Sequence, residues 1–153
     1  MADYIEQIKE MLTNSPIKWV SMAGIQADII EPCHVKLSMP IQGLHTNHVN
    51  TAYAGSIFTL AELTGGAFLQ SAYGFDEFVP IVKNAAIKYV KPGTTALSCE
   101  VTLTAQEAEE RLVPIRERGR GNYPLTIQVL DESSETVAEV NFTYYLLPVP
   151  PRQ

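Results

Sequence analysis

The sequence is short of several features that mark specialised classes of protein. It contains only two cysteines, Cys33 and Cys99, which lie far apart and lack the spacing of metal ligands. A disulfide framework is therefore not expected, and a reduced, cytoplasmic protein is the default. No apolar run reaches the length of a membrane span, and the first residues show no signal-peptide pattern. We expect no membrane partner.

Positive charge is also scarce, with 11 lysines and arginines against 17 acidic residues and a net charge of −6. This balance disfavours a nucleic-acid partner, which needs an excess of basic side chains. No glycine-rich phosphate loop is present, and the sequence indicates no cofactor. At 153 residues the chain is most simply one domain, residues 1–153, large enough to bury about 70% of its unfolded surface.

What the sequence does contain is one long apolar stretch, residues 54–73, with a single charged side chain, Glu62. Apolar residues fall on every face, so this stretch is predicted to be a buried central helix. The pair Gly65-Gly66 would allow close packing against a sheet or a twin helix. An unpaired carboxylate in such a helix costs several kcal/mol, so Glu62 needs either a structural partner or a chemical role.

The start of this helix offers a chemical role. Its first N–H groups lack intrahelical partners and carry the positive end of the helix dipole, and Gly55 lets a ligand approach them. Ala54 and Glu62 lie on nearly the same face, about 12 Å apart along the axis. We expect the Ala54 and Gly55 N–H groups to polarise a carbonyl that Glu62 attacks, or toward which it activates water.

These residues resemble a known signature. Residues 53–62 are similar to the motif of hotdog-fold acyl-CoA thioesterases of the PaaI-like branch, which reads His-Gly-Gly, six residues, then Asp or Glu on the long central helix. Residues 47–52 and 54–56 also resemble the YiiD C-terminal type of hotdog thioesterase. Residues 87–93 resemble the strand that follows the helix in that fold. Together the similarity covers the whole chain.

The chain departs from the PaaI-like motif at two positions. Tyr53 stands where the family has His, and Ala54 stands where it has its first Gly. The Ala54 N–H group remains available, because a backbone donor needs no particular side chain. The resemblance implies a hotdog fold, an acyl-CoA substrate with Tyr53 beside it, and a homodimer or dimer of dimers with active sites at the subunit boundary.

Hydrophobic periodicity predicts the other elements. Residues 3–13 form a short amphipathic helix, and two strands follow, one within residues 17–30 with a bend or bulge at Gly24 and one over 35–39. Four more strands are predicted after the central helix, over residues 79–90, 96–104, 123–129 and 138–146. The fold class is α+β: one antiparallel sheet of about six strands, its edges covered or paired, wrapped around the central helix.

Residues 40–53 form a polar loop before the helix. The resemblance implies a loop asparagine at Asn47, which is the best candidate to orient the water or the carboxylate. Asn50 is the competing choice, since it could equally shape the turn into the helix. His45 and His48 are three residues apart, but no third ligand follows at a matching spacing, so a solvated loop is favoured over a metal site.

Coenzyme A is anionic and would need a local basic patch. Lys88 and Lys91 are candidate phosphate contacts, and the arginines of residues 107–120 are rivals. For residues 107–120 a charged, mobile connection between strands is the favoured interpretation. The acyl group would lie in a pocket lined by Phe58, Phe68 and Tyr73 together with residues of a neighbouring subunit.

The sequence therefore favours an acyl-CoA thioesterase. A structural role for Glu62, paired by loop amides or by a partner subunit, is the alternative for that residue. A non-catalytic acyl-thioester binding module and a hotdog hydro-lyase acting on hydroxyacyl thioesters are the alternative functions, and a structural dimer without a ligand is a third. The hydro-lyase would want a His opposite the carboxylate, and the family's position for that His holds Tyr53.

Overall fold

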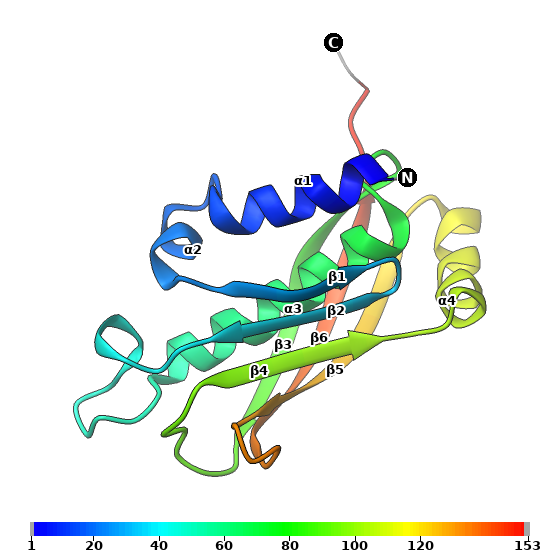
Figure 1. Cartoon of the computed structure of the whole chain (residues 1–153). Helices are drawn as coiled ribbons and strands as arrows, with labels where there is room; N and C mark the ends of the chain where they lie inside the picture. The colour runs from blue at the N-terminus through cyan, green and yellow to red at the C-terminus, as the bar shows by residue number, and fades with distance from the viewer. Residues whose placement is uncertain (1, 152–153) are drawn as a thin grey trace.

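Six strands form one antiparallel sheet that curves around a single long helix (Figure 1). The computed structural model describes residues 2–151. The strands lie side by side in the order β1-β2-β4-β5-β6-β3. Their bounds are Gln26–Glu31 for β1, His34–Met39 for β2, Phe78–Tyr89 for β3, Leu97–Thr102 for β4, Gly121–Leu130 for β5 and Thr136–Pro148 for β6. The predicted α+β class and six-stranded sheet are confirmed.

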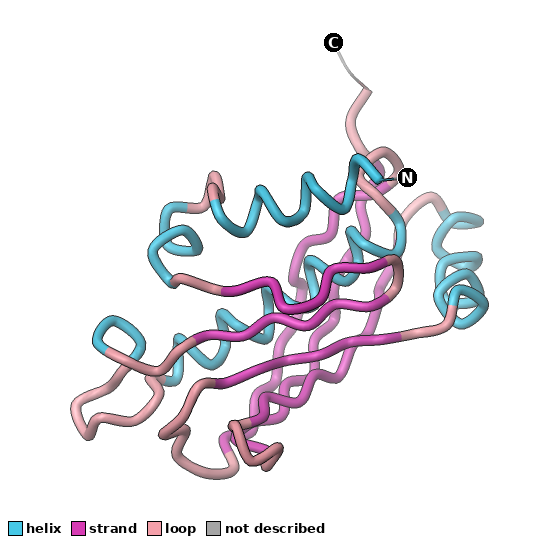
Figure 2. The backbone as a smooth tube through the Cα atoms, viewed as in Figure 1, coloured by secondary structure: helices cyan, strands magenta, loops and turns pink. Residues whose placement is uncertain are grey.

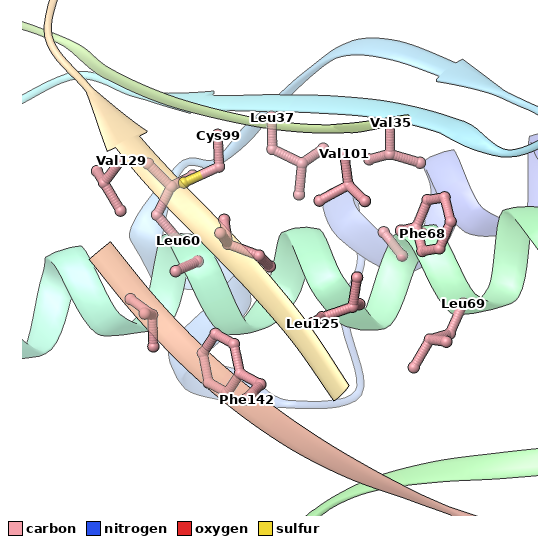
Figure 3. Packing of buried hydrophobic residues seen from close by; sticks show 14 of the residues in the cluster. Val35, Leu37, Leu60, Phe68, Leu69, Cys99, Val101, Leu125, Val129 and Phe142 are labelled. Carbon is pink, nitrogen blue, oxygen red and sulfur yellow. The ribbon is translucent and has the colours of Figure 1, made fainter. Parts of the chain in front are cut away.

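The central helix, α3, spans Ala54–Tyr73, the bounds predicted from the sequence. Its apolar side chains face the concave side of the sheet, and those of Leu60 and Phe68 are completely inaccessible to solvent. Figure 3 shows Phe68 close to Val35 and Val101, which come from neighbouring strands. The main core of the chain therefore lies between α3 and the sheet.

The two adjacent glycines of α3 have different surroundings. A methyl group on Gly65 would lie 2.7 Å from the ring carbon Cζ of Tyr144 on β6, so the helix and the sheet meet closely there. No atom lies within 4 Å of the place that a methyl group on Gly66 would take. Gly65 provides the close packing expected of this pair, whereas Gly66 faces open space within the chain.

Two short helices precede the sheet. Helix α1, Ala2–Thr13, packs the buried side chains of Ile8 and Leu12 against α3 and β1. Helix α2 spans Lys18–Ala23 and ends on Gly24, whose φ of 63° is left-handed. A left-handed glycine commonly ends a helix. The strand predicted within residues 17–30 is therefore confined to β1, and the bulge predicted at Gly24 is a helix cap.

Residues 105–118 form a helix, α4, Ala105–Arg118, where a mobile charged connection was predicted. The Thr104 hydroxyl accepts a hydrogen bond of 3.1 Å from the Glu107 N–H group, and the Glu107 carboxylate accepts one of 2.8 Å from the Thr104 N–H group. This capping box fixes the helix start. Figure 2 shows α4 apart from the other helices, beyond the end of β4. The prediction for this segment is wrong.

The two edges of the sheet differ. Strand β1 forms one edge, and α1 lies along it (Figure 1). Strand β3 forms the other edge and pairs on one side only, with β6. An open edge of this length is a template for pairing with another chain. Among residues 2–151, no helix is long and apolar enough to cross a membrane.

Candidate active site

Glu62 lies in the third turn of α3, at the edge of an open groove of about 520 Å³. The side of α3 that faces this groove contributes Glu62 and Phe58. The rest of the apolar lining comes from α2 with the residue before it, and from β3: Ile17, Trp19, Val20, Pro80, Ile81 and Val82. Clefts with apolar walls and few polar groups are typical ligand sites. Glu62 is thus the ionisable side chain of an apolar groove.

The Glu62 carboxylate is half-buried, and no hydrogen bond or ion pair from the described residues reaches it. Burial raises its pKa above the ordinary glutamate value, because the groove stabilises the charged form less than water does. A structural carboxylate would be expected to have a partner. The structural role considered for Glu62 therefore lacks a partner within this chain.

The start of α3 lies in a different hollow, of about 380 Å³. No side chain caps the helix, so its first N–H groups are free of such a bond. The Tyr89 hydroxyl donates a hydrogen bond of 3.0 Å to the Ala54 carbonyl and fixes the first turn against β3. The Tyr53 ring covers Gly55, where a methyl group would lie 2.6 Å from the ring. Tyr89 was not predicted as a site residue.

The structure does not bring Glu62 and the Ala54 N–H group into one hollow of the same chain. The two hollows share no lining residue and follow one another along α3, with Ala54 and Glu62 about 12 Å apart along the helix axis. Strand β3 borders both, with Pro80 and Val82 beside Glu62 and with Tyr89 beside Ala54.

Asn47 lines the hollow at the helix start, but the loop uses its carboxamide. Its Nδ2 group donates to the Thr51 hydroxyl at 2.9 Å, and its Oδ1 atom accepts from the N–H groups of Val49 and Thr51 at 3.0 and 3.1 Å. Asn50 is exposed in the turn, with a left-handed φ of 59°. Of the two asparagines, Asn47 shapes the loop, and neither lies beside Glu62.

The two candidate lysines differ in their surroundings: Lys88 lies within β3, whereas Lys91 follows its end. Lys91 lines the hollow at the helix start and pairs with Asp131, at 2.7 Å, and with Glu135. Lys88 is paired in register with Glu139 of β6, on the face of the sheet away from α3. Only Lys91 is thus placed near the predicted carbonyl site, and a phosphate would have to compete with its two carboxylates.

The pocket residues predicted from the sequence separate in the structure. Phe58 lines the Glu62 groove, with its ring edge to face against Phe142. Phe68 is fully buried, and the Tyr73 hydroxyl is held by Ala108 and Tyr123. Neither of these two lines a hollow that contains Glu62 or Ala54.

Two further side chains from the loop and the arginine-rich segment, His45 and Arg116, are held by structural contacts. Both ring nitrogens of His45 contact backbone carbonyl oxygens, of Gln42 at 2.8 Å and of Ala23 at 2.6 Å, so this side chain ties the loop to the end of α2. In α4, the Arg116 guanidinium pairs with Glu77 and Glu109, at 2.7 Å in each case. These contacts fasten the loop and α4 to the body of the chain.

Residues 8–146 match the model of a protein family described as a domain of unknown function (DUF4442). The chain belongs to this family. A comparison with curated proteins finds no match. A crystal structure from Pseudomonas aeruginosa, of a protein of unknown function described as a probable thioesterase, is similar to this DUF4442 chain at 34% identity, with a TM-score of 0.86 over 94% of this chain and 95% of that one.

More distant structures have the same fold. A candidate thioesterase from Shewanella oneidensis is 21% identical, with a TM-score of 0.78 over 97% of this DUF4442 chain and all of its own. A mutant thioesterase from Pseudomonas aeruginosa is 12% identical, with a TM-score of 0.73 over 95% of this chain and 94% of its own. The predicted hotdog fold and the resemblance to thioesterases are confirmed.

Proposed function

We propose that this DUF4442 protein hydrolyses acyl-CoA thioesters with Glu62 as the nucleophile or general base. The observation that carries the proposal is the Glu62 carboxylate itself, unpaired within the described residues and half-buried in an apolar groove. Burial raises its pKa, which makes it a stronger base than an ordinary glutamate. The thioesterase names of similar structures support the reaction type.

The active site in this proposal forms between two chains. Strand β3 offers an open edge, and the small residues Ala85 and Ala86 near its middle are exposed. If two β3 strands pair antiparallel about Ala85, position 81 of one strand lies opposite position 89 of the other. Because position 81 borders the Glu62 groove and Tyr89 borders the Ala54 hollow, each groove then adjoins the partner's helix start.

Exposed apolar side chains support this homodimer. Eleven large apolar residues are exposed in the described part of the chain, and all but Val113 belong to α2 and the residue before it, to the loop before α3, or to β3 and the residue after it. Apolar surface concentrated in this way is typical of protein interfaces. A dimer, or a dimer of dimers, would cover much of it.

The chemistry follows from this arrangement. Glu62 takes a proton from water as the water oxygen attacks the thioester carbonyl carbon, or its carboxylate attacks that carbon directly. The carbonyl oxygen gains negative charge, which the partner's Ala54 and Gly55 N–H groups stabilise together with the helix dipole. The tetrahedral intermediate then breaks its C–S bond. The thiolate of coenzyme A leaves and takes up a proton. When water is the nucleophile, the acid is formed in this step and the proton comes from Glu62; when Glu62 is the nucleophile, an anhydride with its carboxylate remains, and a water molecule hydrolyses it to release the acid and restore Glu62.

Thiol release from a panel of acyl-CoA thioesters tests the proposal. Glu62→Ala and Glu62→Gln should both lose at least a hundredfold in kcat, because the attacking or activating group is gone. Glu117→Gln, which removes an exposed carboxylate on α4, is the matched control and should keep wild-type turnover. Wild-type turnover by folded Glu62 variants would contradict the mechanism. A ligand-raised melting temperature without thiol release would instead identify a binding module.

A further inference from the structure

A narrow slot runs between α1 and α3 and holds about 190 Å³. On the α3 side, Glu62, Gly66 and Gln70 line it, each one helical turn from the next, so the slot extends about 12 Å along the helix. The α1 side contributes Ile8, Met11 and Leu12. The slot is therefore an apolar passage that begins at the Glu62 carboxylate and runs away from the helix start.

The slot and the Glu62 groove are continuous. Ile17, Glu62 and Pro80 line both of them. A carbonyl group that reacts with Glu62 lies at their junction, so one of its two substituents can extend into the slot. The sulfur side of an acyl-CoA leads to amides and phosphates, which an apolar slot would desolvate at a cost. The acyl side has no such groups when it is a hydrocarbon.

Gly66 provides a second, independent observation. A glycine inside a helix is less stable than an alanine, and space for an alanine side chain is present at this position. The missing side chain keeps the slot open at its midpoint. On the α1 side, Ile8 and Leu12 are buried core residues, so this wall of the slot cannot move outward without disturbing the core.

We propose that this slot binds the acyl chain of the thioester and that the substrates are thioesters of unbranched aliphatic acids rather than of aromatic acids. This inference rests on the proposed function. A passage that follows the row Glu62, Gly66 and Gln70, with Leu63 and Ala67 beside it, fits an extended unbranched chain, whereas a ring at the junction would have to remain in the groove. Each methylene group taken up by the slot adds hydrophobic stabilisation until the chain reaches Gln70.

The experiment measures kcat/KM for acetyl-, hexanoyl-, decanoyl- and benzoyl-CoA with the wild type, Gly66→Leu, Gly66→Ala and Met11→Ala. The wild type should prefer decanoyl- to benzoyl-CoA. Gly66→Leu fills the slot and should lower the decanoyl-to-acetyl ratio at least tenfold, with a smaller decrease for Gly66→Ala. Met11→Ala widens the slot and should shift the preference in the opposite direction. Gln106→Leu adds apolar volume on exposed α4 and should leave the ratio unchanged.

A measurement of binding separates failure of this inference from failure of the proposed function. S-decyl-coenzyme A, which cannot be hydrolysed, should raise the melting temperature of the wild type by several degrees more than that of Gly66→Leu. If the wild type hydrolyses thioesters but none of the slot variants alters the chain-length ratio, the slot assignment is overturned. Equal thermal shifts in wild type and Gly66→Leu overturn it even if no thioester is hydrolysed.

Discussion

The Tyr144 hydroxyl donates a hydrogen bond of 2.8 Å to the main-chain carbonyl of Glu62. Tyr144 is fully buried on β6, and its ring approaches α3 at Gly65, one turn beyond the carboxylate. Burial, and then the neighbouring Glu62 charge, raise the pKa of Tyr144, so the hydroxyl keeps its proton and remains a donor. The sheet therefore holds the helical turn that carries the candidate catalytic group.

Substituting the two adjacent glycines of α3 should give opposite results. Gly65→Ala places a methyl group against the buried Tyr144 ring and should destabilise the fold by about 3 kcal/mol. Gly66→Ala meets no atom and should be neutral or stabilising by up to about 1 kcal/mol, because alanine favours the helix. Urea unfolding of both variants checks this. Equal losses of stability would mean that the helix does not approach the sheet at Gly65.

Removal of the Tyr144 hydroxyl should affect both stability and catalysis. Tyr144→Phe leaves the Glu62 carbonyl with its helical bond only, and should cost about 1 kcal/mol of unfolding free energy. If the hydroxyl positions the catalytic turn, kcat should fall several-fold while KM changes little. Tyr123→Phe removes another buried tyrosine hydroxyl, which is bonded to Tyr73 at the C-terminal end of α3, and is the control. A fall in kcat of the same size in both variants would remove the positioning role.

The sequence predicted α3 to the residue because a long apolar run on every face of a helix has few other structures available to it. The helical segments α2 and α4 were missed, although each carries a local signal. Thr104 and Glu107 have the spacing of a capping box, and Gly24 lies where a left-handed cap ends a helix. In α4 the run of charged residues indicated a loop. In the segment of α2 the apolar–polar alternation of the residues that follow indicated a strand.

The site was harder to predict than the fold. Glu62 and the helix start could be identified from their positions in α3, but the walls around Glu62 could not. Trp19 lines the groove from α2, and Pro80 lines it from β3, the edge strand of the sheet. Such contacts depend on tertiary structure rather than on periodicity. The separation of the Ala54 and Glu62 hollows likewise depends on tertiary structure, because β3 lines both of them.

The Glu62→Gln variant should be more stable than the wild type at alkaline pH. Burial raises the pKa of Glu62, so the folded chain binds this proton more tightly than the unfolded chain. The free energy of unfolding then falls as the pH rises from the ordinary glutamate pKa through the raised pKa. Glutamine removes this dependence. Urea midpoints of the two proteins should agree near pH 4 and favour the variant at pH 8.

The acid limb of the pH profile for thiol release should lie above the usual glutamate range for the same reason, since the reaction needs the ionised carboxylate. The Glu117→Gln control measures the effect of losing one exposed carboxylate in both experiments. A variant that is less stable than the wild type at pH 8 would show that Glu62 has a stabilising partner, as in the structural role.

Ala54→Pro should fold and lose thioester hydrolysis. Ala54 is the first residue of α3, where proline is tolerated because the helix does not use that N–H group. The preceding Tyr53 has φ −65° and ψ 138°, which a following proline accepts. The substitution removes the donor proposed to bind the carbonyl oxygen, so kcat should fall by about a hundredfold or more. Melting temperature and circular dichroism establish that the variant is folded.

Mixing the two inactive variants determines whether one site uses two chains. If Glu62 of one chain works with Ala54 of the other, a heterodimer of Glu62→Gln and Ala54→Pro contains one intact site and one doubly altered site. Unfolding and refolding an equimolar mixture should then restore about a quarter of wild-type activity, because half of the dimers are mixed. If both residues act within the same chain, every site retains one substitution, and the mixture remains as inactive as its components.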